Sequence, residues 1–442
     1  MEFRPGNFPV QARNEAQLKD IYYDNLHDIF SLIFFESDST FEALKEFEDL
    51  RIEAIEDYEA KTPWKGFLMA EIKLQWAFIK LKYGEEWGAF WSLRSANKTI
   101  KENTEDFPNF ALNGRTSGML SILFGVTPDN YQWIFNLFGM KGTVKEGIDQ
   151  LRRNRSNSEI FGLESSIILG MVYSHLLENK AMSPQFIMEH PLGTNPLPQY
   201  FQGIILQKSH QASQARVLWQ DEAISVPFKH YLIAESYFQE GRYDSAIVYF
   251  HQFLDAFKGL TYQKDAYLKI ALSHKLQGKN NEYNDYLNMA KASKAESSEI
   301  DKNAQKIMDQ LPTINLDMLQ LRFAIDGGYF DRAQTLIGHL ESSALSELEQ
   351  VELTYRKARL NHVKGENSKA IDLYRQVTEQ AETIEETYYA PNSFLQLGYL
   401  QRDAGDEEAA SMYFERVLSF RKHPYKMSLD SKAKVALSLL DE

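Results

Sequence analysis

Small residues and large apolar residues alternate at helical spacing along the C-terminal half of the chain. In residues 233–253 the small and large positions are Ala234, Tyr237, Ala246, Phe250 and Phe253. Separations of three, four and seven residues place these side chains on one face of each of two helices. Gly241 falls between the two faces and can adopt a left-handed backbone, so we expect it to end the first helix. The pattern predicts two antiparallel helices that approach closely where the small residues meet.

The same pattern recurs in four further segments toward the C-terminus. The positions equivalent to Ala234 are Ala271, Leu321, Ala358 and Gly398. Successive positions are therefore 37, 50, 37 and 40 residues apart. Two segments depart from the pattern, because Leu321 is large and because Tyr283 replaces the second small residue of its segment. The 50-residue interval has room for one additional helix, which we expect within residues 295–311.

This spacing resembles that of the tetratricopeptide repeat superfamily, whose unit is a pair of antiparallel helices of about 34 residues. The resemblance is clear over residues 227–440 and degenerate upstream. The upstream matches contain Trp76 with Ala77, Phe135 with Gly147, and Gly203 with Trp219. The resemblance implies an all-α protein, a right-handed α-solenoid of roughly 20 or more helices in antiparallel pairs. It also implies that a C-terminal helix at residues 428–440 caps the last repeat.

Proline placement divides the chain into an irregular and a regular half. Four of the 13 prolines fall between residues 184 and 198, and such clusters are typical of loops rather than of helix interiors. We therefore expect an irregular N-terminal arm at residues 1–13 and a degenerate helical-repeat half at residues 14–195. The regular tetratricopeptide half, with its capping helix, is expected at residues 196–442.

The resemblance also indicates candidate binding residues, because the first helix of each repeat lines the concave groove of such solenoids. At groove positions this chain has aromatic and basic side chains: Tyr231, Phe238, Lys275, Arg322, Tyr355, Arg359, His362, Tyr399 and Arg402. Arginine can bind a carboxylate through two parallel hydrogen bonds, and aromatic rings offer rigid apolar area. One hypothesis is that the groove takes an extended or helical peptide with acidic and apolar side chains. The alternative is that the arginines pair with neighbouring carboxylates and only keep the groove soluble.

The preferred function is that of a non-enzymatic scaffold or adaptor that binds a protein or peptide segment. Chaperone-binding members of the superfamily hold a terminal carboxylate with Asn at the ninth position of two successive repeats, and that pair is missing from this sequence. The residues at the ninth position are Glu235, Leu272, Arg322, Arg359 and Tyr399. Two alternatives remain open. One is a helical-repeat protein that binds a small ligand, such as a glycan or lipid, with its tryptophans; the other is a structural subunit of a larger envelope assembly.

Composition and motifs argue against nucleic-acid binding and against catalysis. The net charge of −14 is opposite to the charge that binding a phosphate backbone requires. The sequence has no cysteine, and no two of its ten histidines lie three or four residues apart, so thiolate sites, disulfides and helical metal pairs are excluded. Segment 114–118 superficially resembles a nucleophile elbow, but Thr116 occupies its central position and no strand is expected before it. We expect no cofactor, no metal and no enzymatic activity.

The N-terminal sequence leaves the compartment open. Residues 1–10 contain Glu2, Arg4 and two prolines without an apolar run, so no secretory signal is visible. The protein is either cytoplasmic or an exported, mature chain whose signal has been removed, and the irregular start favours the second. Apart from the proline-broken residues 190–207, the longest uncharged stretches are residues 116–128 and 165–177, which are too short to span a membrane.

Overall fold

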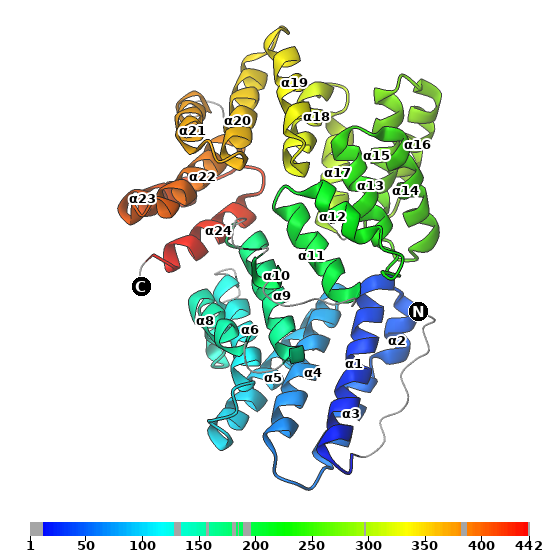
Figure 1. The fold of residues 1–442 in the computed structure, drawn as a ribbon, viewed down its shortest axis with the longest axis vertical. Helices are drawn as coiled ribbons and strands as arrows, with labels where there is room; N and C mark the ends of the chain where they lie inside the picture. The colour runs from blue at the N-terminus through cyan, green and yellow to red at the C-terminus, as the bar shows by residue number, and fades with distance from the viewer. Residues whose placement is uncertain are drawn as a thin grey trace. The chain divides into compact units, whose positions relative to one another are not determined.

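A computed structural model describes residues 12–127, 134–155, 159–178, 183, 185–188, 196–295, 298–381 and 387–440. These residues form α-helices joined by turns, and they contain no β-strand. The chain divides into two compact units (Figure 1). The first comprises residues 1–169, 225–228 and 257–259, and the second comprises residues 170–224, 229–256 and 260–442. None of the described helices combines the length and apolar character that crossing a bilayer requires.

The helices of the first unit are α1 (Glu15–Phe35), α2 (Asp38–Leu44), α3 (Phe47–Glu56), α4 (Pro63–Lys82), α5 (Glu86–Asp106), α6 (Asn113–Val126) and α8 (Val144–Asn154). Helix α9 (Glu159–His175) contains the division between the units. The second unit begins with α10 (Gln185–Met188), α11 (Pro196–Lys208), α12 (Ala212–Trp219), α13 (Lys229–Glu240), α14 (Tyr243–Ala256), α15 (Gln263–Leu276) and α16 (Asn280–Ala292). It continues with α17 (Glu299–Gln310), α18 (Leu316–Gly327), α19 (Phe330–Glu341), α20 (Glu347–Val363), α21 (Asn367–Ala381), α22 (Tyr389–Asp403), α23 (Glu407–Ser419) and α24 (Lys426–Ser438).

Small residues lie where the paired helices of the second unit touch. Ala246 on α14 and Ala410 on α23 are fully buried. A Cβ atom added to Gly398 on α22 would lie 2.4 Å from the ring of Phe414 on α23, so only glycine allows this approach. Gly241 has φ 86° between α13 and α14, as expected for a residue that ends a helix. The fold class predicted from the sequence, an all-α right-handed α-solenoid of antiparallel helix pairs, is confirmed.

The degenerate matches upstream also correspond to helix pairs. Helices α4 and α5 pack together with Trp76 in their buried core, and Gly203 on α11 lies against the indole of Trp219 on α12. The match at Phe135 differs, because Gly147 on α8 packs against Gly118 on α6. A Cβ atom on Gly147 would lie 2.4 Å from the backbone oxygen of Gly118. The pairing is therefore α6 with α8, a longer connection than the repeat spacing implied.

The 50-residue interval contains α17, the additional helix expected from the sequence, and here the repeats stack irregularly. Helix α17 packs on α15, while α13 packs directly on α18. The rings of Phe238 on α13 and Phe323 on α18 are 5.1 Å apart in an edge-to-face contact. The hydroxyl of Tyr243 donates a hydrogen bond to Gln320 Oε1 at 2.9 Å. The pair α15 and α16 therefore does not separate α13 from α18.

The last helix of the second unit, α24, packs against α22 and α23, as expected for a cap on the final repeat. The predicted boundary at residue 195 lies outside the described residues, as do most of residues 1–13, so these parts of the predicted domain organisation stay predictions. The division in the structure falls at residue 169, within α9.

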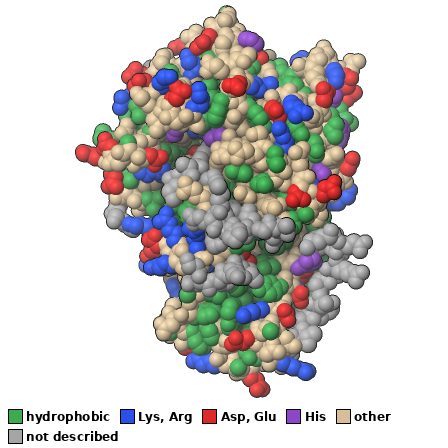
Figure 2. All heavy atoms as spheres, viewed as in Figure 1, with side chains coloured by type: hydrophobic (Ala, Val, Ile, Leu, Met, Phe, Trp, Pro, Cys, Tyr) green, Lys and Arg blue, Asp and Glu red, His purple; other side chains and the backbone are tan. Residues whose placement is uncertain are grey.

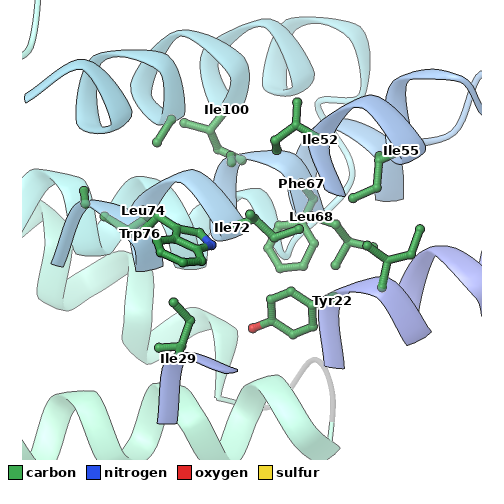
Figure 3. Packing of buried hydrophobic residues seen from close by; sticks show 14 of the residues in the cluster. Tyr22, Ile29, Ile52, Ile55, Phe67, Leu68, Ile72, Leu74, Trp76 and Ile100 are labelled. Carbon is green, nitrogen blue, oxygen red and sulfur yellow. The ribbon is translucent and has the colours of Figure 1, made fainter. Parts of the chain in front are cut away.

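The first unit has its own apolar core, built around α1, α3, α4 and α5 (Figure 3). The indole of Trp76 is fully buried and donates a hydrogen bond to Asn25 Oδ1 at 2.9 Å. Arg51 donates to the same oxygen at 3.0 Å and forms an ion pair with Asp28. Both members of that pair are 1% exposed. A buried charge is tolerated in such a core because it is paired and hydrogen-bonded.

Candidate binding site on the C-terminal repeats

A polar cavity of about 150 Å³ lies on the first helices of three successive repeats, α18, α20 and α22, and on the capping helix α24. It is lined by Glu178, Arg322, Asp326, Tyr355, Arg356, Arg359, Tyr388, Asn392, Leu395, Gln396 and Lys432. All of these residues belong to the second unit. Four lining side chains are cationic and two are anionic, which contrasts with the net charge of −14 of the whole chain. Figure 2 shows acidic and basic side chains interspersed over the visible face.

Helical spacing brings these side chains together. Arg322 and Asp326 are four residues apart on α18, and Tyr355 and Arg359 are four residues apart on α20. Side chains at this spacing lie on the same helix face. Since α18 and α22 both pack against α20, three such faces meet at the cavity.

Arg356 is fixed by two partners. Its guanidinium forms an ion pair with Glu352 at 2.7 Å and donates a hydrogen bond to the hydroxyl of Tyr388 at 2.9 Å. Burial acts against the guanidinium charge, but Tyr388 and Glu352 outweigh it and raise the pKa of Arg356. With its side chain 9% exposed, Arg356 acts as a wall of the cavity rather than as a free donor.

Arg359 and Arg322 are less fully paired. Arg359 Nη1 donates to Gln396 Oε1 at 2.8 Å, and Arg359 forms no ion pair with a described carboxylate. Arg322 Nε lies 3.8 Å from Asp326 Oδ2, and its guanidinium makes no hydrogen bond to any described residue. Burial tends to raise the pKa of Asp326, but Arg322 and neighbouring cations outweigh it and lower that pKa. Asp326 is therefore a charged neighbour of Arg322 and not its hydrogen-bonded partner.

The other residues that line the cavity include one ion pair and two polar groups without a hydrogen-bond partner among the described residues. Lys432 on the capping helix forms an ion pair with Glu178, 254 residues away in the sequence. The side-chain oxygen of Asn392 is buried and accepts no hydrogen bond from the described part of the chain. Tyr355 is 3% exposed, and its hydroxyl likewise has no hydrogen-bond partner among the described residues. The cavity thus presents unused donors from Arg322, Arg359 and Tyr355.

Comparison with known families identifies two of the repeats, and the second of them contributes α22 to this site. Residues 230–259 and residues 391–423 each match a family model described as tetratricopeptide repeat. The first match covers α13 and α14, and the second covers most of α22 and all of α23. Both matched segments are tetratricopeptide repeats.

Two solved structures are similar to this tetratricopeptide repeat protein over most of its length. One is a monomeric mutant of IFIT1 with Gppp-AAAA, at 13% identity and a TM-score of 0.29, with 91% of this chain and 93% of that chain covered. The other is the APC/C hetero-tetramer Cut9-Hcn1, at 13% identity and a TM-score of 0.24, with 96% and 97% covered. At this identity and TM-score neither likeness bears on function. None of the curated proteins matches the chain.

The tetratricopeptide frame locates the cavity only in part. Of the candidate groove residues, Arg322, Tyr355 and Arg359 line it together. The lining residues Arg356, Gln396 and Asp326 fall at positions of the first helix that were not assigned to the groove. Their spacing of one or four residues from groove positions is a signal that could have included them. Lys432 and Glu178 lie outside the repeat frame, so no repeat pattern could have identified them.

The other candidate residues do not line the cavity. Tyr231 and Phe238 are buried on α13, and Tyr399 is buried on α22 against Phe414. Lys275 is exposed and lies 4.8 Å from the ring centroid of Tyr283. The last two candidates lie near aromatic rings of their own repeats: His362 Nδ1 is 3.4 Å from the hydroxyl of Tyr374, and Arg402 pairs with Asp403 and stacks on Tyr399.

A buried ion network occupies the groove positions of the first two repeats. Lys269 is 3% exposed, and its ammonium lies 2.8 Å from Asp265 and also pairs with Glu235. The hydroxyl of Tyr231 donates to Asp265 at 2.5 Å. Burial raises the pKa of Glu235, although Lys269 opposes this effect. The polar residues of this part of the groove are therefore bound to one another.

Two other sequence features have structural explanations. Segment 114–118 lies in α6, where Arg115 pairs with Glu71 and Glu164 and the hydroxyl of Thr116 donates to Glu71, so it forms no catalytic turn. The tryptophans considered for a glycan or lipid site differ in exposure. Trp76 is buried and Trp64 is half-buried, whereas Trp87 and Trp91 are 73% and 52% exposed, and Trp133 lies outside the described residues.

Proposed function

We propose that this tetratricopeptide repeat scaffold is non-enzymatic and binds a segment of a partner protein along α18, α20 and α22. The observation that supports the proposal is the incomplete pairing of Arg322 and Arg359. Arg322 has only a distant carboxylate, and within the cavity Arg359 donates to the neutral amide of Gln396 rather than to a carboxylate. Such groups gain charge-assisted hydrogen bonds when an acidic partner arrives, and each gain exceeds that of a neutral hydrogen bond.

The shape of the site suits a side chain rather than a whole small ligand. The cavity is smaller than the 300–1,000 Å³ or so that is typical of small-molecule pockets. Its lining is mostly polar, with Leu395 as the one aliphatic residue in it. An anchor of this kind fixes one acidic position of a bound segment, while neighbouring residues of the segment contact the exposed helix faces on either side.

Affinity capture with charge-reversal variants tests this proposal. The double variant Arg322→Glu and Arg359→Glu places two carboxylates at the site, so a partner held through an acidic group is repelled and its recovery should fall at least tenfold. Arg375→Glu on α21 is the matched control, because Arg375 is an exposed arginine on a second helix. A discrete protein recovered by the wild type and the control but lost with the double variant supports the proposal, once a synthetic fragment of it binds the purified chain. Equal recovery by all three proteins contradicts it.

A further inference from the structure

The hydrogen-bond donors of the cavity outnumber what one carboxylate can accept. Arg322 uses none of its five N–H groups for a hydrogen bond to a described residue, and Arg359 hydrogen-bonds only the neutral groups of Gln396 and Tyr374, which leaves N–H groups unused. The hydroxyl of Tyr355 adds a third unused donor, from a residue that is only 3% exposed. A carboxylate is planar, and a single guanidinium can satisfy it through two parallel hydrogen bonds. Two guanidiniums and a phenol that converge from two helices match a group with more oxygens.

The balance of charge around the cavity also favours an anion with more oxygens than a carboxylate. Lys432 forms an ion pair with Glu178. Arg356 forms one with Glu352, a residue that does not line the cavity. Arg322 and Arg359 then face one carboxylate, Asp326, at a distance of 3.8 Å from Arg322. After these pairs are counted, two guanidiniums stand against one carboxylate, so the site keeps an excess of positive charge. An anion with more than two acceptor oxygens can balance this charge and bind both guanidiniums at once.

We infer that the cavity holds the phosphate group of a phosphate monoester, carried by a phosphorylated side chain of the bound segment. The two guanidiniums bind the phosphate oxygens, the Tyr355 hydroxyl donates to a third oxygen, and the Asn392 side-chain oxygen accepts from an N–H group of the segment. Such an ester has a charge of about −1.5 to −2 at neutral pH and three strong acceptor oxygens. This inference rests on the proposed function, since it specifies what the scaffold recognises.

The first test compares three synthetic peptides that differ only at a central residue, which is phosphoserine, glutamate or serine. Isothermal titration should show at least tenfold tighter binding of the phosphoserine peptide than of the glutamate peptide. Arg322→Gln and Arg359→Gln should each remove that preference, whereas Arg375→Gln should keep it. Circular dichroism and thermal melting of the variants establish that they are folded. Equal binding of the phosphoserine and glutamate peptides overturns the inference.

The second test uses the ionisation of the phosphate itself. The second pKa of a phosphate monoester is about 6, so binding of the phosphoserine peptide should weaken severalfold between pH 7.5 and pH 5. The charged and titratable groups at the site are the lining residues Arg322, Arg356, Arg359, Asp326, Glu178 and Lys432, together with His210, which lies against Asp326. Inorganic sulfate keeps its double charge across this range and reports any titration of these groups. A phosphoserine peptide whose affinity follows that of sulfate at every pH contradicts the inference.

Two further arms separate this inference from the proposed function and identify the source of the phosphate. A captured partner that still binds after phosphatase treatment, but not to the Arg322→Glu and Arg359→Glu variant, leaves the proposed function intact and overturns the phosphate inference. Free phosphoserine and inorganic phosphate serve as competitors. The inference predicts that either one displaces the phosphopeptide only at much higher concentration, because the segment adds contacts. Displacement by free phosphate at the same concentration as by the peptide overturns a site for a phosphorylated segment.

Discussion

Small residues at the helix contacts set how closely each pair of helices can approach. Gly398 shows this most sharply, because its Cα faces the fully buried ring of Phe414. The protein interior is packed as densely as an organic crystal, so an added methyl group at such a place has nowhere to go. The same residue type has no packing role where the helix faces solvent, as at Gly338 on α19.

Gly398→Ala is therefore expected to destabilise the second unit by about 1–3 kcal/mol, the usual cost of overpacking a core. The measurement is the shift of the urea unfolding midpoint. Gly338→Ala is the control, since a Cβ atom there meets nothing within 4 Å. That control should raise the free energy of unfolding by up to about 1 kcal/mol, because alanine is the better helix former. A loss of stability at Gly338 as large as at Gly398 would contradict the packing argument.

His175 at the end of α9 provides a second prediction at the residue scale. Burial, together with the nearby Lys208, lowers the pKa of His175 to about 4 from the ordinary value of 6.5. Between these values the unfolded chain binds a proton that the folded protein does not, so the free energy of unfolding falls as the pH falls from 6.5 to 4. We expect His175→Gln to reduce that fall by about 2 kcal/mol relative to the wild type. His339→Gln, at an exposed position on α19, is the control variant.

At the scale of single elements, α17 shows how an inserted helix can support a repeat. Asp301 on α17 is fully buried and accepts hydrogen bonds from the backbone N–H groups of Tyr262 at 2.6 Å and Asp265 at 3.1 Å. These N–H groups lie at the start of α15, where a helix has donors without partners of its own. Asp301 therefore caps a helix to which it does not belong.

Asp301→Ala should destabilise the second unit by about 2–3 kcal/mol, because it leaves two buried N–H groups without an acceptor. Thermal unfolding and hydrogen exchange at the start of α15 are the measurements. Asp309→Ala on the same helix is the control, since Asp309 is exposed and receives only a side-chain hydrogen bond from Gln305. Exchange at residues 262–265 that is the same in both variants would show that α15 does not depend on this cap.

At the scale of the whole molecule, the two compact units have separate cores. The core of the first unit surrounds Trp76 and Phe67, and the repeats of the second unit have cores of their own, such as the one around Phe414. Repeat proteins stabilise each segment mainly through its neighbours, so damage is expected to remain local.

Phe67→Ala should therefore increase hydrogen exchange in α1, α4 and α5 and leave α20 to α23 protected. The expected loss is about 3–5 kcal/mol in the first unit, since the ring is fully buried. Phe414→Ala is the reciprocal variant and should increase hydrogen exchange in α22, α23 and α24, which share the core around this ring. Hydrogen-exchange mass spectrometry of both variants is the measurement, and equal loss of protection in both units would show a single cooperative core.

Sequence periodicity alone predicts the helix pairs, the turns at Gly241 and its equivalents, the additional helix α17 and the cap α24. These features depend on contacts within one or two repeats, and such contacts leave a regular period along the chain. It also predicts Arg322, Tyr355 and Arg359 as groove residues, and these three line one cavity.

Which of the candidate groove residues line the cavity could be seen only in the folded chain. The direct packing of α13 on α18 and the Lys269 network remove Tyr231 and Phe238 from the surface, while Glu178 and Lys432 complete a cavity from 254 residues apart. Residues that meet from distant segments have no fixed spacing in the sequence, so a periodic sequence pattern cannot predict their contacts. The physical reason is that helix periodicity follows from local backbone geometry. Which charged residues pair across the fold depends instead on which distant segments the folded chain brings together.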